Sequence, residues 1–134
     1  MTHFSKLFVA PLAALLLAAA PPDDNDKQIT EAHFVSFQPI IMTVVQERQI
    51  QGLVQLEVTL RLYDPTNWDR TSRLRARLKD RLVQAVAGLT NGAIRVDAPI
   101  NIPLITAVMQ RQIDKELGPD YARVLITDAT TRKQ

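Results

Sequence analysis

The sequence predicts an α+β domain, a mainly antiparallel sheet with two helices packed on one face. Residues 54–62 alternate strictly between apolar and polar side chains, which is typical of a strand with one buried and one solvent-facing side. Farther along, apolar residues recur at helical spacing in two segments, 65–89 and 101–117. Because the strands come first and the helices follow, the expected order is β-β-α-(β)-α-β, where the bracketed strand is short.

The first two strands are expected to form a hairpin. The segment from His33 to Val45 is rich in β-branched and aromatic residues, which favours a strand. Pro39 has no N–H to donate, so this strand should lie at an edge or be broken by a bulge there. After a short polar connection comes the alternating strand. Its even-numbered residues are expected in the core: Val54, Leu56, Val58, Leu60 and Leu62.

The first helix is expected to begin where Tyr63, Asp64 and Pro65 follow the second strand. Asp64 is a good N-cap, Pro65 suits the first helical position, and Tyr63 can pack on Trp68. Gly88 is expected to end the helix. The apolar residues at helical spacing are Leu74, Leu78, Leu82, Ala85, Val86 and Leu89.

The rest of the chain is expected to form one more helix and a closing strand. The turn-rich segment from Asn91 to Pro99 contains a small apolar stretch, Ala93–Val96, which could form a short strand. The second helix should run from Asn101 or Pro103 to Leu117 and end at Gly118-Pro119. A final strand is predicted at Arg123–Thr130, followed by a polar tail, residues 131–134.

The amino-terminal residues are expected to direct export. Lys6 precedes an uncharged apolar run of fourteen residues, Leu7–Ala20. An export signal needs an apolar region of roughly 7–15 residues, whereas a membrane-spanning helix needs about 20. Pro21 makes the cleavage site poor, so residues 1–20 are interpreted as a signal peptide or, if uncleaved, a short membrane tether. The expected organisation is then a polar linker at 21–31, a single domain at 32–130 and the tail, in the periplasm.

The composition excludes several kinds of chemistry. The chain has no cysteine, which excludes disulfides, thiolate-bound zinc and cysteine catalysis. Beyond the export segment the only histidine is His33, and a lone histidine beside an aromatic residue is more often structural than catalytic. Ser36 and Ser72 lie outside any G-x-S-x-G pattern. The sequence therefore predicts a non-enzymatic protein with no cofactor and no bound metal.

Arginines cluster in the first predicted helix. Within residues 69–81 they face only two acids, Asp69 and Asp80. Residues four apart share one side of a helix, so part of the cluster should form a stripe. The stripe is either a solvated surface or a docking surface for an acidic partner or lipid headgroups. The candidate partner-binding residues are Arg70, Arg73, Arg77 and Arg81.

The overall charge does not favour nucleic acid as a partner. Of the 16 Lys and Arg residues, Lys6 lies in the export segment, so 15 remain against 14 Asp and Glu. A nearly neutral chain creates no strong field around the whole protein. No aromatic residues alternate with the arginines, as they do in many single-strand-binding surfaces.

The order of these segments resembles the FliL-like family, whose founding members are proteins associated with the flagellar basal body. The resemblance covers residues 33–130 and includes small exported alphaproteobacterial proteins. The segments that carry it are FVSFQPIIMTVV, LVQLEVTLRL, RLRARLKDRLVQAVAGL, MQRQIDKELG and RVLITDAT. The resemblance implies a stomatin-like α+β fold in the periplasm, which in the flagellar members supports the stator units of the motor. Flagellar members also carry an acidic-glycine-lysine stretch where this chain reads VDAPINIPLI.

Together, the residues and the resemblance predict a non-enzymatic periplasmic protein that acts through protein–protein contacts. The expected partner is an envelope protein, at the flagellar motor or in another envelope assembly. Self-association and attachment to the inner membrane are compatible with this interpretation. The alternative is an exported module that binds a ligand or a lipid surface with its arginine-rich helix.

Overall fold

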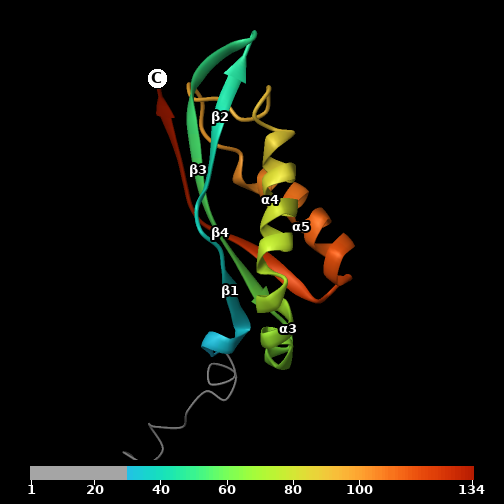
Figure 1. Cartoon of the computed structure of the whole chain (residues 1–134). Helices are drawn as coiled ribbons and strands as arrows, with labels where there is room; N and C mark the ends of the chain where they lie inside the picture. Colours follow the sequence, from blue (N-terminus) through green and yellow to red (C-terminus); the bar gives the residue numbers. More distant parts are fainter. Residues whose placement is uncertain (1–29) are drawn as a thin grey trace, which may run out of the picture.

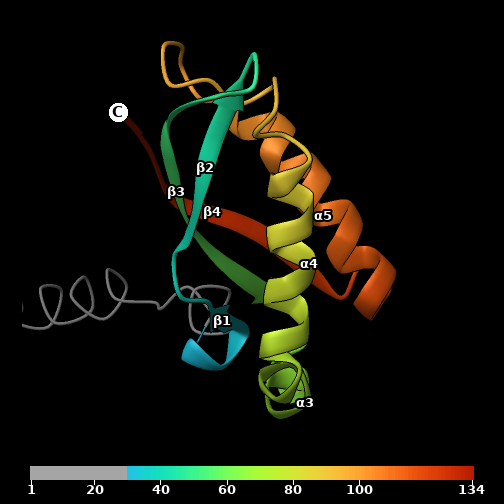
Figure 2. The same cartoon turned by 45° about the horizontal axis from the view of Figure 1, so that its top comes forward.

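The computed structural model describes residues 30–134 and shows an α+β domain with a four-stranded antiparallel sheet (Figure 1). Helices α4 and α5 run side by side and cover one face of the sheet (Figures 1 and 2). The predicted α+β class and the antiparallel sheet are thus confirmed. The elements in chain order are η1 (Glu31–His33), β1 (Phe34–Ser36), β2 (Ile40–Gln46), β3 (Gln49–Leu62), η2 (Pro65–Asn67), α3 (Trp68–Arg73), α4 (Arg75–Ala87), α5 (Ile102–Leu117) and β4 (Ala122–Lys133), where η denotes a 3-10 helix.

Strand β3 is the centre of the sheet, with β1 and β2 on one side and β4 on the other. The segment around Pro39 is not part of either edge strand, so the predicted first strand is broken there into β1 and β2. Both parts nevertheless pair with β3, and the Phe37 N–H between them donates to the Val58 carbonyl at 3.2 Å. Pro39 therefore divides the edge strand into two parts, and both parts still pair with β3.

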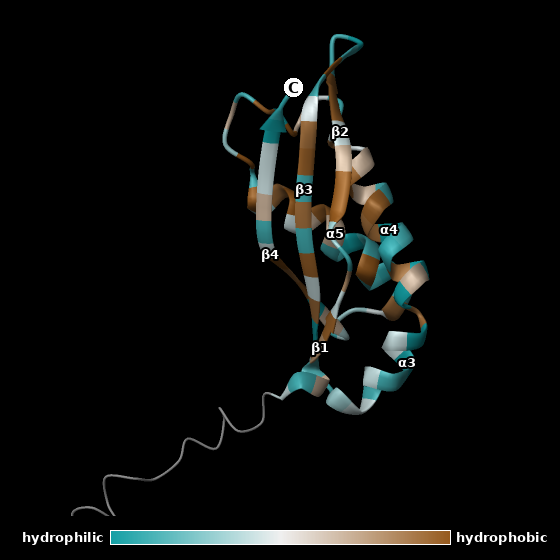
Figure 3. Ribbon diagram, turned by 60° about the vertical axis from the view of Figure 1, so that its left-hand side comes forward, coloured by the Kyte–Doolittle hydropathy of each residue, from teal (hydrophilic) through white to brown (hydrophobic). Residues whose placement is uncertain are grey.

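The core lies between β3 and the two long helices. The even-numbered residues of β3 from Val54 to Leu62 are 0–2% exposed, as the alternation predicts. They meet the apolar side of α4 at Leu78 and Leu82 and the apolar side of α5 at Ile105, Met109 and Ile113. Glu57 and Thr59 alternate with these residues and so belong to the opposite face of the strand. Figure 3 shows the sheet from that side, with no helix in front of it. One face of β3 thus forms the floor of the core and the other remains free of helices.

The first predicted helix is divided into η2, α3 and α4. Its start is as expected, because the Asp64 carboxylate accepts from the Thr66 N–H at 2.9 Å and Pro65 begins η2. The Thr66 hydroxyl donates to the same carboxylate at 2.7 Å, and this bond, together with that of the N–H, lowers the pKa of Asp64. Leu74 separates α3 from α4 with dihedral angles outside the helical range, φ −91° and ψ 7°. Tyr63, which was expected to pack on Trp68, is 57% exposed.

Two expectations for the later part of the chain are wrong. Residues 93–96 form turns and not a strand. The Ile94 N–H donates to the Leu89 carbonyl, and the Arg95 guanidinium forms two hydrogen bonds with the Asp97 carboxylate. These local contacts hold the segment. That guanidinium also lowers the pKa of the Asp97 carboxyl. Residues 131–133, expected as a polar tail, extend β4 because β3 begins as early as Gln49 and needs a partner there.

Gly52 permits this extension of β4. Its backbone lies against that of Arg132, and a Cβ at position 52 would stand 2.1 Å from the Arg132 carbonyl oxygen. Only glycine fits such a close approach of two backbones. Helix α5 has the predicted ends, since Asn101 accepts from the Leu104 N–H at 3.1 Å and Gly118 follows with φ 101°.

The predicted export segment, residues 1–20, lies outside the described residues, as does most of the predicted linker. Among the residues that are described, no helix combines the length and the apolar character needed to cross a membrane.

Candidate functional site

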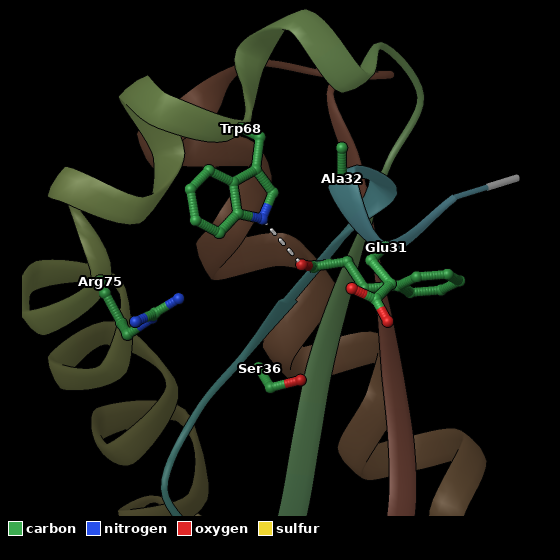
Figure 4. A pocket seen from close by; sticks show the side chains of 6 residues that line it. Glu31, Ala32, Ser36, Trp68 and Arg75 are labelled. Atoms are coloured by element: carbon green, nitrogen blue, oxygen red, sulfur yellow. Dashed lines mark hydrogen bonds between the residues drawn. The ribbon is translucent and has the colours of Figure 1, made fainter.

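An apolar groove lies beside β1, at the end of the sheet where residue 30 enters the domain. Its volume is about 580 Å³, within the range of roughly 300–1,000 Å³ that is usual for ligand sites. Figure 4 shows Trp68 forming one wall, with Arg75 and Glu31 on opposite sides. The lining residues are Glu31, Ala32, Phe34, Ser36, Trp68 and Arg75.

Trp68 is held as a rigid wall of this groove. The Asp64 cap sets the start of the helical segment that carries it. Its indole N–H donates to the Phe34 carbonyl at 3.0 Å, which ties α3 to the outer edge of β1 (Figure 4). A half-buried tryptophan with its one donor satisfied presents its ring as a fixed apolar surface.

The opposite wall is an edge strand with backbone groups available for pairing. In an antiparallel ladder, successive residues direct their N–H and C=O alternately toward and away from the neighbouring strand. The Phe37 N–H bonds to β3, so the backbone of Ser36 points away from β3, on the side where the groove lies. The outward groups of Phe34 are both taken, since its carbonyl accepts from Trp68 and its N–H donates to the Glu31 carbonyl. Ser36 is therefore the position at which an added strand could pair.

The two charges at the groove have no partner in the described part of the chain. Arg75 and Glu31 form no ion pair within residues 30–134, and both side chains are exposed. A guanidinium presents a planar set of donors that matches a carboxylate with two parallel hydrogen bonds. The groove thus combines an apolar wall, a free strand edge and one guanidinium that can bind a carboxylate.

The four arginines that the sequence offers as candidate partner-binding residues each have a contact inside the domain. Arg77 and Arg81 both contact the carboxylate of Glu116 on α5, at 3.0 and 2.6 Å, and the Glu116 side chain is only 12% exposed. Arg70 lies over the Tyr121 ring, 5.9 Å from its centre, and Arg73 donates to the Asp69 carbonyl at 3.3 Å. Arg77 and Arg81 therefore link α4 to α5, and Arg70 covers Tyr121, whereas the bond of Arg73 stays within α3.

The break at Leu74 also changes the geometry of the arginines. Arg73 belongs to α3, whereas Arg77 and Arg81 belong to α4, so the three do not form one row on one helix. Arg75 lies in the same cluster but between the expected positions, and it is the arginine that reaches the groove. Helical spacing alone contained no signal that would separate Arg75 from its neighbours.

The other side chains considered for catalysis have structural surroundings. The His33 ring takes part in the cap of η1, where Nδ1 accepts from the Thr30 N–H at 3.0 Å. The Ser36 hydroxyl lies 3.3 Å from that of Thr59, and the Ser72 hydroxyl is buried on α3 with no hydrogen-bond partner. Within residues 30–134 no three His, Asp or Glu side chains are grouped closely enough to hold a metal ion.

The groove and the arginines are therefore the candidate binding features, and the fold around them is α+β. No protein-family model, curated protein or solved structure matches this chain. The FliL-like resemblance stays a prediction. The role of the domain has to be inferred from the chemistry of the groove.

Proposed function

We propose that this chain is an exported, non-enzymatic domain that holds an extended segment of another envelope protein in the groove beside β1. The observation that carries the proposal is the combination of an outward-facing strand edge at Ser36 with the apolar wall of Trp68. Addition of a strand to a free sheet edge is a common way to bind a peptide, because backbone hydrogen bonds supply affinity and adjacent pockets supply specificity.

The charges define what kind of segment fits. Arg75 favours an Asp or Glu side chain, or a terminal carboxylate, on its side of the groove. Glu31 on the other side repels an acid and thereby selects the direction in which the segment lies. The apolar surface of Trp68 and Phe34 favours an apolar residue between these two ends. The partner segment is thus extended, apolar in its middle and acidic at one end.

The alternative function, binding of a ligand or lipid surface through the arginine-rich helix, receives less support. Arg77 and Arg81 already share the carboxylate of Glu116, which offsets part of the positive charge that a headgroup would meet. By contrast, Arg75 is free of any such contact in the described part of the chain. Membership of a flagellar or other envelope assembly remains part of the proposal, because it rests on the resemblance.

The groove is tested by site-specific crosslinking in intact cells. A photoreactive residue in place of Ala32, which is exposed and lines the groove, should crosslink to a defined envelope protein. The same residue in place of Asn91, an exposed turn position outside the groove, is the position control. We expect the Ala32 crosslink to disappear with Arg75→Glu and to persist with Arg123→Glu, an equal charge reversal on the open face of the sheet.

Mass spectrometry of the crosslinked peptide should then identify a segment that contains Asp or Glu. Because Trp68 is the only tryptophan of the chain, a synthetic copy of that segment should shift its fluorescence. Equal crosslinking from positions 32 and 91, or a crosslink that survives Arg75→Glu, would contradict binding in the groove.

Export is tested separately from binding. A reporter enzyme that is active only in the periplasm, fused after Gln134, should be active because Lys6 and the following apolar run resemble an export signal. Deletion of residues 2–20 should abolish that activity. Activity with a cytoplasmic reporter alone would show that the chain is not exported.

A further inference from the structure

Parts of both outer edges of this sheet are covered by other elements of the domain. On the outer edge of β1, Trp68 takes the Phe34 carbonyl, and on the outer edge of β2 the Val45 N–H donates to the Thr90 carbonyl at 3.1 Å. On β4, the side-chain amide of Gln110 donates to the Ala122 carbonyl and accepts from the Val124 N–H, both at 2.8 Å. On the β4 side of the sheet, the stretch left without such cover among the described residues is the second half of β4.

That second half has backbone groups directed away from the sheet. Residues 128, 130 and 132 lie opposite Glu57, Gln55 and Leu53, whose backbones face β4, so they bond to β3. Ala129 and Thr131, which alternate with them, direct their N–H and C=O outward. Among the described residues, no strand other than β3 pairs with β4. Such an unpaired edge is a ready template for another strand.

We propose that a second copy of this chain pairs with this edge, antiparallel and centred on Thr130. A two-fold axis at Thr130 places Ala129 opposite Thr131 of the partner subunit, and each such pair exchanges two backbone hydrogen bonds. The two sheets then become one continuous sheet. The β-bulge between Glu57 and Val58, which leaves Thr127 as the extra residue of β4, marks where the pairing ends.

The charges of β4 choose this register. Asp128 and Arg132 lie on the open face, two residues before and two residues after Thr130. With the axis at Thr130, Asp128 lies opposite Arg132 of the partner subunit, and the symmetry repeats this pair. An axis at residue 128 or 132 would instead place like charges opposite each other, which is unfavourable.

The single copy also leaves an electrostatic conflict that the partner removes. Asp128 lies directly opposite Glu57 on the open face, and within residues 30–134 neither Asp128 nor Arg132 forms an ion pair. Two acids in cross-strand positions repel each other. Arg132 of the partner subunit would stand on the other side of Asp128 and offset part of the repulsion between these two acids.

Disulfide trapping tests the register, since the chain has no cysteine of its own. In a pair that is not hydrogen-bonded, opposite Cα atoms lie about 4.5 Å apart, which falls within the roughly 4.4–6.8 Å that a disulfide spans. We expect full-length Thr130→Cys to form a covalent dimer on mild oxidation. Thr43→Cys, an exposed threonine on the opposite edge strand, is the matched control and should remain monomeric. Equal crosslinking of both variants would overturn the proposal.

Charge reversal tests whether Asp128 pairs with Arg132 of the partner subunit, because the double variant should restore the pair that each single variant breaks. Asp128→Arg or Arg132→Asp should shift the full-length protein from dimer to monomer in sedimentation analysis, while the double variant should restore the dimer. Circular dichroism should be unchanged in all three, because both side chains are exposed. A monomeric native protein, or a double variant that does not recover, would overturn the proposal. Arg75→Glu should leave the dimer intact, which separates this inference from the proposed groove.

Discussion

Replacing Leu56 with aspartate should unfold the domain. Leu56 lies near the middle of β3, is fully buried, and belongs to the cluster that joins the sheet to α4 and α5. An uncompensated carboxylate buried at this place costs roughly 3–5 kcal/mol. Whole domains are stable by only about 5–15 kcal/mol, and a small domain lies at the lower end. Circular dichroism and chemical denaturation should show a protein that is unfolded or close to it.

The control places the same aspartate on the other face of the same strand. Thr59 belongs to the open face, where its hydroxyl contacts Ser36 near solvent. Thr59→Asp should change the free energy of unfolding by no more than about 1 kcal/mol. If Thr59→Asp unfolded the protein and Leu56→Asp did not, the assignment of the two faces would be reversed.

Replacing Gln110 with leucine should destabilise the domain through the edge of β4. The variant keeps an apolar side chain of similar length but removes the amide that bonds to Ala122 and Val124. Both of these residues are 1% exposed. The change therefore leaves a carbonyl and an N–H buried without partners, at a cost of about 1–3 kcal/mol for each group. Denaturant titration should show the loss, and the Val124 amide should exchange its hydrogen faster.

Gln112 on the same helix provides the matched comparison. It is half-buried like Gln110. Gln112→Leu should alter stability by roughly 0.5 kcal/mol or less, as is usual for substitutions away from such networks. Equal effects of the two variants would mean that the loss at Gln110 comes from helix packing and not from its bonds to β4.

The surroundings of Glu116 show why the candidate site was only partly predictable. The arginines were recognised in the sequence as an unusual cluster, but their carboxylate partner lies on a different helix, 35 residues beyond Arg81. An arginine stripe looks the same in sequence whether it faces solvent, a partner protein or a glutamate of the same chain. The distinction depends on how α4 and α5 pack, which no local pattern contains.

The groove was missed for a similar reason. Its residues come from η1, β1, α3 and α4, and each of them has an ordinary local explanation. Trp68 was interpreted as structural, and its hydrogen bond to Phe34 does have a structural role. The groove exists only because the break at Leu74 and the Asp64 cap place Trp68 beside the outer edge of β1.

Features governed by a few neighbouring residues were determined by the sequence alone. Alternation along β3 sets which side chains face the core, because successive residues of a strand point to opposite sides. The interruption at Pro39, the caps at Asp64 and Asn101, and the helix end at Gly118 follow from the backbone chemistry of single residues.

Tertiary structure decided every feature that depends on a distant partner. Residues 131–133 became strand because β3 offers them a ladder, and residues 93–96 became turns because no described strand pairs with them. Gln110 acquired its role from the backbone of β4, and Glu116 became the partner of two arginines. A hydrogen bond or an ion pair needs two groups, and the sequence of one segment specifies only the first of them.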